Sequence, residues 1–98
     1  MCTRDECISR LTEATPVLRK EYGVKSMRLF GSMARGDNRV DSDVDVLVEM
    51  PPKMFQLIGM KQYLRGLLGL NVDVVRMHPG IDTFLLSQIE RDGVTIFA

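Results

Sequence analysis

Residues 26–50 read SMRLFGSMARGDNRVDSDVDVLVEM, and this stretch decides the fold. Its first five residues, Ser26 to Phe30, alternate in polarity, which predicts a strand that ends at Gly31. Residues 31–36 predict a turn that opens a short helix. Residues 43–50, DVDVLVEM, predict a second strand, because valine recurs at every second position and therefore lies on one face.

The flanking sequence continues the alternation of helices and strands. Apolar residues at helical spacing predict a helix over residues 3–22, which Pro16 kinks or restarts. Further predictions are a helix over residues 54–68, a strand over 71–77, a helix over 81–91 and a strand over 94–97. This order predicts an α/β fold, and the length of 98 residues fits a single domain spanning residues 1–98.

Composition excludes several classes of protein. Hydrophobic residues make up 45% and charged residues 27%, which is typical of a folded domain and not of a disordered chain. Thirteen basic and thirteen acidic residues give zero net charge, so nucleic acid is not expected as the main partner. No apolar run is long enough to span a bilayer. Cys2 and Cys7 lack the spacing of a metal site, and we interpret them as reduced thiols of a cytoplasmic protein.

The second strand begins with a pair of carboxylates. Asp43 and Asp45 are two residues apart, so both side chains point to the same face while Val44 faces the core. Two like charges this close are unfavourable unless a cation neutralises them. Mg²⁺ prefers oxygen ligands and typically binds one or two carboxylates together with substrate phosphates. We therefore predict a magnesium site at Asp43 and Asp45.

A candidate phosphate-binding turn precedes this pair. Gly31 has no Cβ, so a phosphate can approach its backbone closely. Ser32 offers a hydroxyl and an amide at the start of the predicted short helix. The turn and the carboxylate pair together indicate phosphoryl or nucleotidyl transfer.

Asp73 supplies a third carboxylate. It lies between valines in the strand predicted at residues 71–77, where a charged residue is unexpected without a partner. If the two strands are neighbours, Asp73 joins the pair as a metal ligand or as the general base that deprotonates the attacking hydroxyl. Otherwise it is a polar residue of an edge strand.

These motifs resemble those of a known superfamily. Gly31-Ser32, ten intervening residues and then Asp43-Val44-Asp45 is similar to the signature of the DNA polymerase β-like nucleotidyltransferases. The longer run GSMARGDNRVDSDVDVLVEM resembles the small prokaryotic branch, the minimal nucleotidyltransferases (MNT). The resemblance covers about residues 27–98.

The resemblance implies a single nucleotidyltransferase-fold domain, with a mixed β-sheet of about four strands flanked by helices. It implies two Mg²⁺ ions, held by Asp43, Asp45 and Asp73, and ATP as the donor, with Gly31 and Ser32 binding phosphate. Members of this branch resemble antitoxins that inactivate HEPN-family toxins by adding AMP to a tyrosine. A HEPN toxin is therefore the expected partner.

Arg35 and His78, which lie near these motifs, each allow two interpretations. Arg35 contacts either a triphosphate oxygen, as a nucleotide-binding residue, or the loop acids Asp37 and Asp41. His78, the one histidine, fits a solvated turn residue better than a catalytic base.

The leading functional hypothesis is a protein adenylyltransferase that acts as an antitoxin. The first alternative is a non-catalytic antitoxin that neutralises its partner by forming a complex. The second is a small-molecule nucleotidyltransferase whose missing domain is supplied by another chain. Substitution of both Asp43 and Asp45 by Asn discriminates the first two, because binding alone survives that change.

Overall fold

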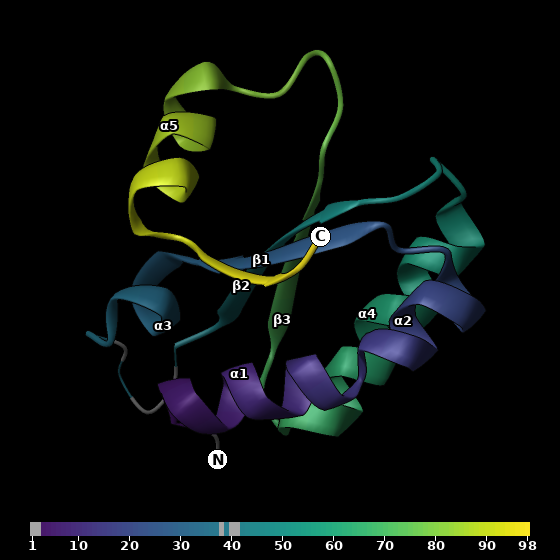
Figure 1. Ribbon diagram of the computed structural model, residues 1–98, viewed down its shortest axis with the longest axis horizontal. Coiled ribbons are helices and arrows are strands. Elements are labelled where there is room, and N and C mark those ends of the chain that lie inside the picture. The colour runs from purple at the N-terminus through teal and green to yellow at the C-terminus, as the bar shows by residue number, and fades with distance from the viewer. Residues whose placement is uncertain (1–2, 38, 40–41) are drawn as a thin grey trace.

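The computed structural model describes residues 3–37, 39 and 42–98, and in these residues helices alternate with the strands of one sheet (Figure 1). The helices are α1 (Arg4–Glu13), α2 (Thr15–Tyr22), α3 (Gly31–Arg35), α4 (Met54–Leu68) and α5 (Thr83–Asp92). The strands are β1 (Ser26–Phe30), β2 (Val44–Glu49), β3 (Val72–Arg76) and β4 (Val94–Phe97).

The N-terminal helical segment is divided into two helices, as Pro16 suggested. Thr3 caps α1 by accepting a hydrogen bond from the Glu6 backbone amide at 3.2 Å. Pro16 lies in the first turn of α2, where its missing N–H costs no helical hydrogen bond. Gly23 ends α2 in the left-handed conformation, with a φ of 68°.

The sheet is mixed, in the order β3-β2-β1-β4. β1 pairs antiparallel with both β2 and β4, whereas β2 and β3 are parallel and are connected by α4. The register places Asp45 opposite Phe30 of β1 on one side and opposite Asp73 of β3 on the other. The predicted α/β fold with a mixed sheet of about four strands is confirmed.

The hydrophobic core lies between one face of the sheet and three helices. Figure 1 shows α1, α2 and α4 together on this face and α5 on the opposite face. The valines of β2 point into the core as predicted, and Val44, Val46 and Val48 are all fully buried. The helices contribute Cys7, Leu11, Leu18, Met60, Leu64 and Leu68, each with no exposed surface.

The bounds of the second strand differ slightly from the prediction. The strand predicted over residues 43–50 spans Val44–Glu49, so Asp43 directly precedes β2. The first turn of α4 is more exposed than the middle of the helix, because Met54 is 72% exposed whereas Met60 is fully buried.

Within the described ranges, none of the helices combines the length and apolar character needed to cross a bilayer. Cys7 is fully buried in the core, and Cys2 lies outside the described residues.

Candidate active site

The candidate site forms where β1 ends and the neighbouring strands begin. Because β1 runs antiparallel to β2, its last residue, Phe30, lies beside Asp45 near the start of β2. Because β3 runs parallel to β2, Asp73 near the start of β3 lies on the other side of Asp45. The topology therefore brings Gly31, Asp45 and Asp73 to the same end of the sheet, as the sequence interpretation required.

Gly31 packs directly against the Asp45 carboxylate. Its φ of 75° is in the left-handed region, which favours glycine. A Cβ at Gly31 would collide with Oδ2 of Asp45 and would lie 3.1 Å from its Cγ. The first turn of α3 therefore approaches the carboxylate as closely as a backbone can, and only glycine permits that approach.

The short helix α3 is held from two directions. The Arg4 guanidinium of α1 donates a hydrogen bond from Nε to the carbonyl of Ala34 at 2.9 Å. Just beyond the C-terminal end of α3, the amide of Asp37 donates to the Ser32 carbonyl at 3.1 Å. These contacts help to fix the position of Ser32, which is partly buried.

Asp45 feels the charges of the other two aspartates. Partial burial raises the pKa of Asp45 above its ordinary value, and the negative charges of Asp73 and Asp43 raise it further, while Arg35 lowers it. Asp43 and Asp73 themselves are exposed to solvent. Asp45 is therefore the central carboxylate of a like-charged group, the environment in which a bound cation is most stabilising.

The chemistry of this group fits a magnesium ion. Carboxylate oxygens are the ligands that Mg²⁺ prefers. Burial and then the charges of Asp73 and Asp43 raise the pKa of Asp45, and a divalent cation would relieve the repulsion between these carboxylates. Among the described residues, no three His, Cys, Asp or Glu side chains already stand in a metal-holding arrangement. For all three aspartates to share one ion, their carboxylates would have to come closer together than they stand here.

Arg35 makes the loop contact that was one of its two interpretations. Its Nε lies 3.2 Å from Oδ2 of Asp37, and both side chains are exposed. Arg35 is also close enough to Asp45 to lower its pKa. Asp41, the other acid considered for Arg35, lies outside the described residues. His78 is exposed, and its Nδ1 accepts a hydrogen bond from the Gly80 amide at 3.1 Å, so the turn interpretation is confirmed.

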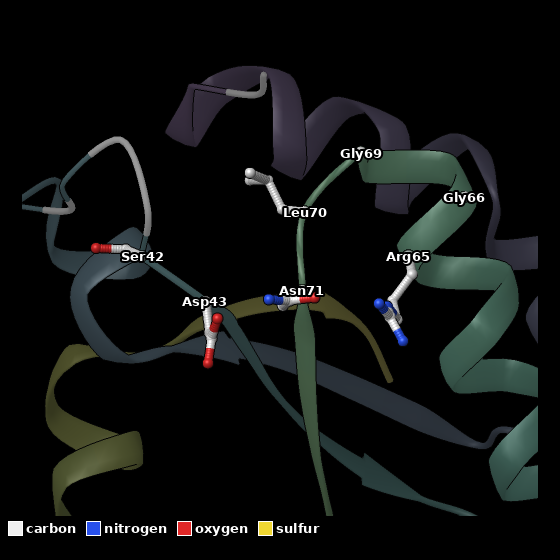
Figure 2. A pocket seen from close by; sticks show the side chains of 7 residues that line it. All are labelled: Ser42, Asp43, Arg65, Gly66, Gly69, Leu70 and Asn71. Carbon is white, nitrogen blue, oxygen red and sulfur yellow. The ribbon is translucent and has the colours of Figure 1, made fainter.

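The sequence interpretation missed a hollow beside the carboxylates that is bounded by α4. A cavity of about 560 Å³ is lined by Ser42, Asp43, Arg65, Gly66, Gly69, Leu70 and Asn71 (Figure 2). A second, of about 340 Å³, is lined by Asp43, Lys61, Arg65, Asn71, Val72 and Asp73. The start of β2 is joined to this region by a hydrogen bond from the Val44 amide to the Asn71 carbonyl at 2.9 Å.

Lys61 and Arg65 carry the charge of this hollow. They are four residues apart on α4, a spacing that places them on one face of the helix. That spacing was visible in the sequence, but the face it occupies is set by the crossover from β2 through α4 to β3. Only the structure shows that the two cations lie beside Asp43 and Asp73.

Three carboxylates at one end of the sheet, with a glycine turn packed against the central one, are suited to phosphoryl and nucleotidyl transfer. Residues 11–96 match the nucleotidyltransferase domain family. Protein adenylyltransferase MntA of Thermococcus cleftensis is 43% identical over 77 residues, which are 76% of this chain and 78% of that relative.

Solved structures show the same fold. A candidate minimal nucleotidyltransferase superposes with a TM-score of 0.77 at 34% identity, covering 95% of each chain. One chain in the complex of a tri-AMPylated Shewanella oneidensis HEPN toxin with an MNT antitoxin superposes with a TM-score of 0.65 at 19% identity. The match covers 93% of this chain and 72% of the chain in the complex. This chain belongs to the nucleotidyltransferase domain family.

Proposed function

We propose that this chain is a Mg²⁺-dependent protein adenylyltransferase that moves AMP from ATP to a tyrosine hydroxyl of a HEPN-family toxin and so acts as its antitoxin. The observation that carries the proposal is the convergence of Asp43, Asp45 and Asp73 beside Gly31. The adenylyl group and the protein acceptor are suggested by the similarity to the MntA adenylyltransferase, and the HEPN partner by the fold shared with the Shewanella antitoxin.

The three aspartates have separate roles in this mechanism. Asp43 and Asp45 would hold two Mg²⁺ ions, with Asp73 as the third ligand or as the general base. When bound, the metal supplies charge neutralisation for the phosphates and for the pyrophosphate that leaves. Gly31 and Ser32 bind the triphosphate through backbone and hydroxyl, and Arg35 adds a positive charge beside them. The donor phosphates are thereby oriented against Asp45.

The reaction is a single displacement at the α-phosphorus of ATP. The acceptor hydroxyl oxygen forms a bond to that phosphorus, the bond from the phosphorus to the α,β-bridging oxygen breaks, and pyrophosphate departs. The hydroxyl proton passes to the carboxylate of Asp73, which lies on an exposed edge strand and is accessible to an incoming side chain.

One observation favours complex formation as a second candidate function. Met54 and Phe55, in the first turn of α4, are 72% and 90% exposed, and Ile58 one turn later is 47% exposed. An apolar patch of this kind suits a protein interface. It is compatible with an antitoxin that binds its partner whether or not it also modifies it.

The test is transfer from ATP labelled at the α-phosphate, with Mg²⁺ and a HEPN-family protein as the acceptor. Intact-protein mass spectrometry should show AMP added to the partner and not to this chain. The variant carrying Asp43→Asn and Asp45→Asn should still bind the partner without modifying it. If wild type binds the partner tightly and adds no AMP, complex formation replaces catalysis. If label goes only to a small molecule, the protein acceptor is wrong.

A further inference from the structure

The hollow beside Asp43 and Asp73 has a positively charged wall that the proposed reaction leaves without a role. Lys61 and Arg65 of α4 line it, and both are exposed. Within the part of the chain that the structure describes, neither forms an ion pair. In Figure 2, Arg65 extends from α4 toward the segment that contains Asn71. Two like charges one turn apart slightly weaken a helix, and an anionic ligand between them would offset that repulsion.

The wall lies on the side of the site opposite the triphosphate turn. Gly31 adjoins Asp45 from the β1 side, whereas Asp73 adjoins it from the β3 side. Lys61 and Arg65 share their cavity with Asp73 and therefore belong to the β3 side. In an in-line displacement the entering and leaving oxygens stand on opposite sides of the phosphorus. Under the proposed mechanism, pyrophosphate would leave on the Gly31 side, so the acceptor would enter over Asp73 and past this wall.

We infer that Lys61 and Arg65 bind an acidic stretch of the acceptor polypeptide that flanks the modified hydroxyl. This inference rests on the proposed function. The cations add a charge-based contact next to the transferred group, which holds the hydroxyl near Asp73 and selects acceptors by the charge of their neighbouring residues. In the free chain, the negative charges of Asp43 and Asp73 offset the positive charges of Lys61 and Arg65. When these carboxylates bind a metal ion, they no longer neutralise the two cations.

The charge distribution favours a peptide over a nucleic acid as the occupant. A nucleic-acid site typically neutralises about six to ten phosphates, which needs a broad basic surface. Here two cations line a small hollow in a chain of zero net charge. Two cations can neutralise a few carboxylates, but they cannot neutralise a polyanion.

The experiment uses three synthetic peptides that share one tyrosine and differ only in flanking residues, which are all Glu, all Gln or all Lys. Affinity is measured by fluorescence anisotropy with Mg²⁺ and a non-hydrolysable ATP analogue. Wild type should bind the Glu peptide at least about tenfold more tightly than the Gln peptide, and this preference should fade at high salt. The variant with Lys61→Gln and Arg65→Gln should bind both peptides equally. It should keep the wild-type affinity for the ATP analogue.

The matched control is Lys20→Gln with Lys25→Gln, which removes the same charge at two exposed positions outside the hollow. It should keep the preference for the Glu peptide. The inference is overturned if wild type shows no such preference. It is also overturned if the Lys61 and Arg65 variant loses affinity for the ATP analogue, because the wall then binds the donor. Tighter binding of an oligoribonucleotide than of the Glu peptide at this wall would overturn it as well.

Failure of the proposed function gives a different result. In that case wild type adds no AMP to any of the peptides or to the HEPN partner, while the charge-dependent binding of the Glu peptide and its loss in the variant remain.

Discussion

The two faces of β2 differ in what they contribute to the molecule. On one face Val44, Val46 and Val48 are fully buried and stabilise the fold through apolar packing. On the other face, partial burial and the nearby charges of Asp73 and Asp43 raise the pKa of Asp45. Asp45 lies there at the end of the sheet where Gly31 and Asp73 also lie. Stability and function are therefore separated by strand alternation, and substitutions on the two faces should have different consequences.

The largest effect on stability is expected in the core that covers the buried face of β2. Leu64→Ala removes a fully buried side chain of α4 and should lower the free energy of unfolding by about 2–5 kcal/mol. The fraction that remains folded should retain its nucleotide affinity. Urea denaturation measures the effect, and Phe55→Ala is the matched control on the same helix. Because Phe55 is 90% exposed, its truncation should change stability by less than about 0.5 kcal/mol. Equal losses in the two variants would contradict the assignment of the core.

A smaller effect, seen mainly in activity, is expected at Gly31, where β1 ends and α3 begins. Gly31→Val places a branched side chain at a positive φ and against the Asp45 carboxylate. The carboxylate must move, and a displacement of about 1 Å can lower a transfer rate by roughly a hundredfold. Steady-state transfer and calorimetry with an ATP analogue measure the consequence. Unchanged rate and affinity in this variant would remove Gly31 from the site.

How far the sequence predicted the structure depends on what defined each feature. β1 and α4 were predicted with their observed bounds, because glycines mark their ends: Gly31 after Phe30, and Gly69 in the left-handed conformation after Leu68. The proximity of Asp45 and Asp73 required only that two strands be neighbours, and they are.

Features that depend on tertiary packing were not predictable in the same way. The exposure of the first turn of α4, where Met54 is 72% exposed, does not follow from local periodicity. The cationic face formed by Lys61 and Arg65 has a visible helical spacing, but its position beside Asp73 follows from the crossover geometry. The contact between Arg35 and Asp37 was one of two alternatives that sequence left equal.

The smallest effect is expected on the pH dependence of stability without metal. The pKa of Asp45 is higher in the folded chain than in the unfolded chain, so its protonated form favours folding. Stability is therefore lost as the pH rises through the raised pKa. In EDTA, Asp45→Asn should melt at a higher temperature than wild type at neutral pH. The difference should disappear below the ordinary pKa range of aspartate. A lower melting temperature for the variant at neutral pH would contradict the repulsion between the carboxylates.

The most direct test of the central claim is the transfer rate of Asp45→Asn compared with wild type, measured with labelled ATP, Mg²⁺ and the HEPN partner, with melting of both proteins recorded alongside. The substitution preserves size and removes the central charge of the site. We expect Asp45→Asn to fold and to have a transfer rate lower by about 10³-fold or more, because the charge that stabilises the metal and the transition state is gone. A folded variant with near-wild-type turnover would show that the carboxylates of this sheet edge do not carry the reaction.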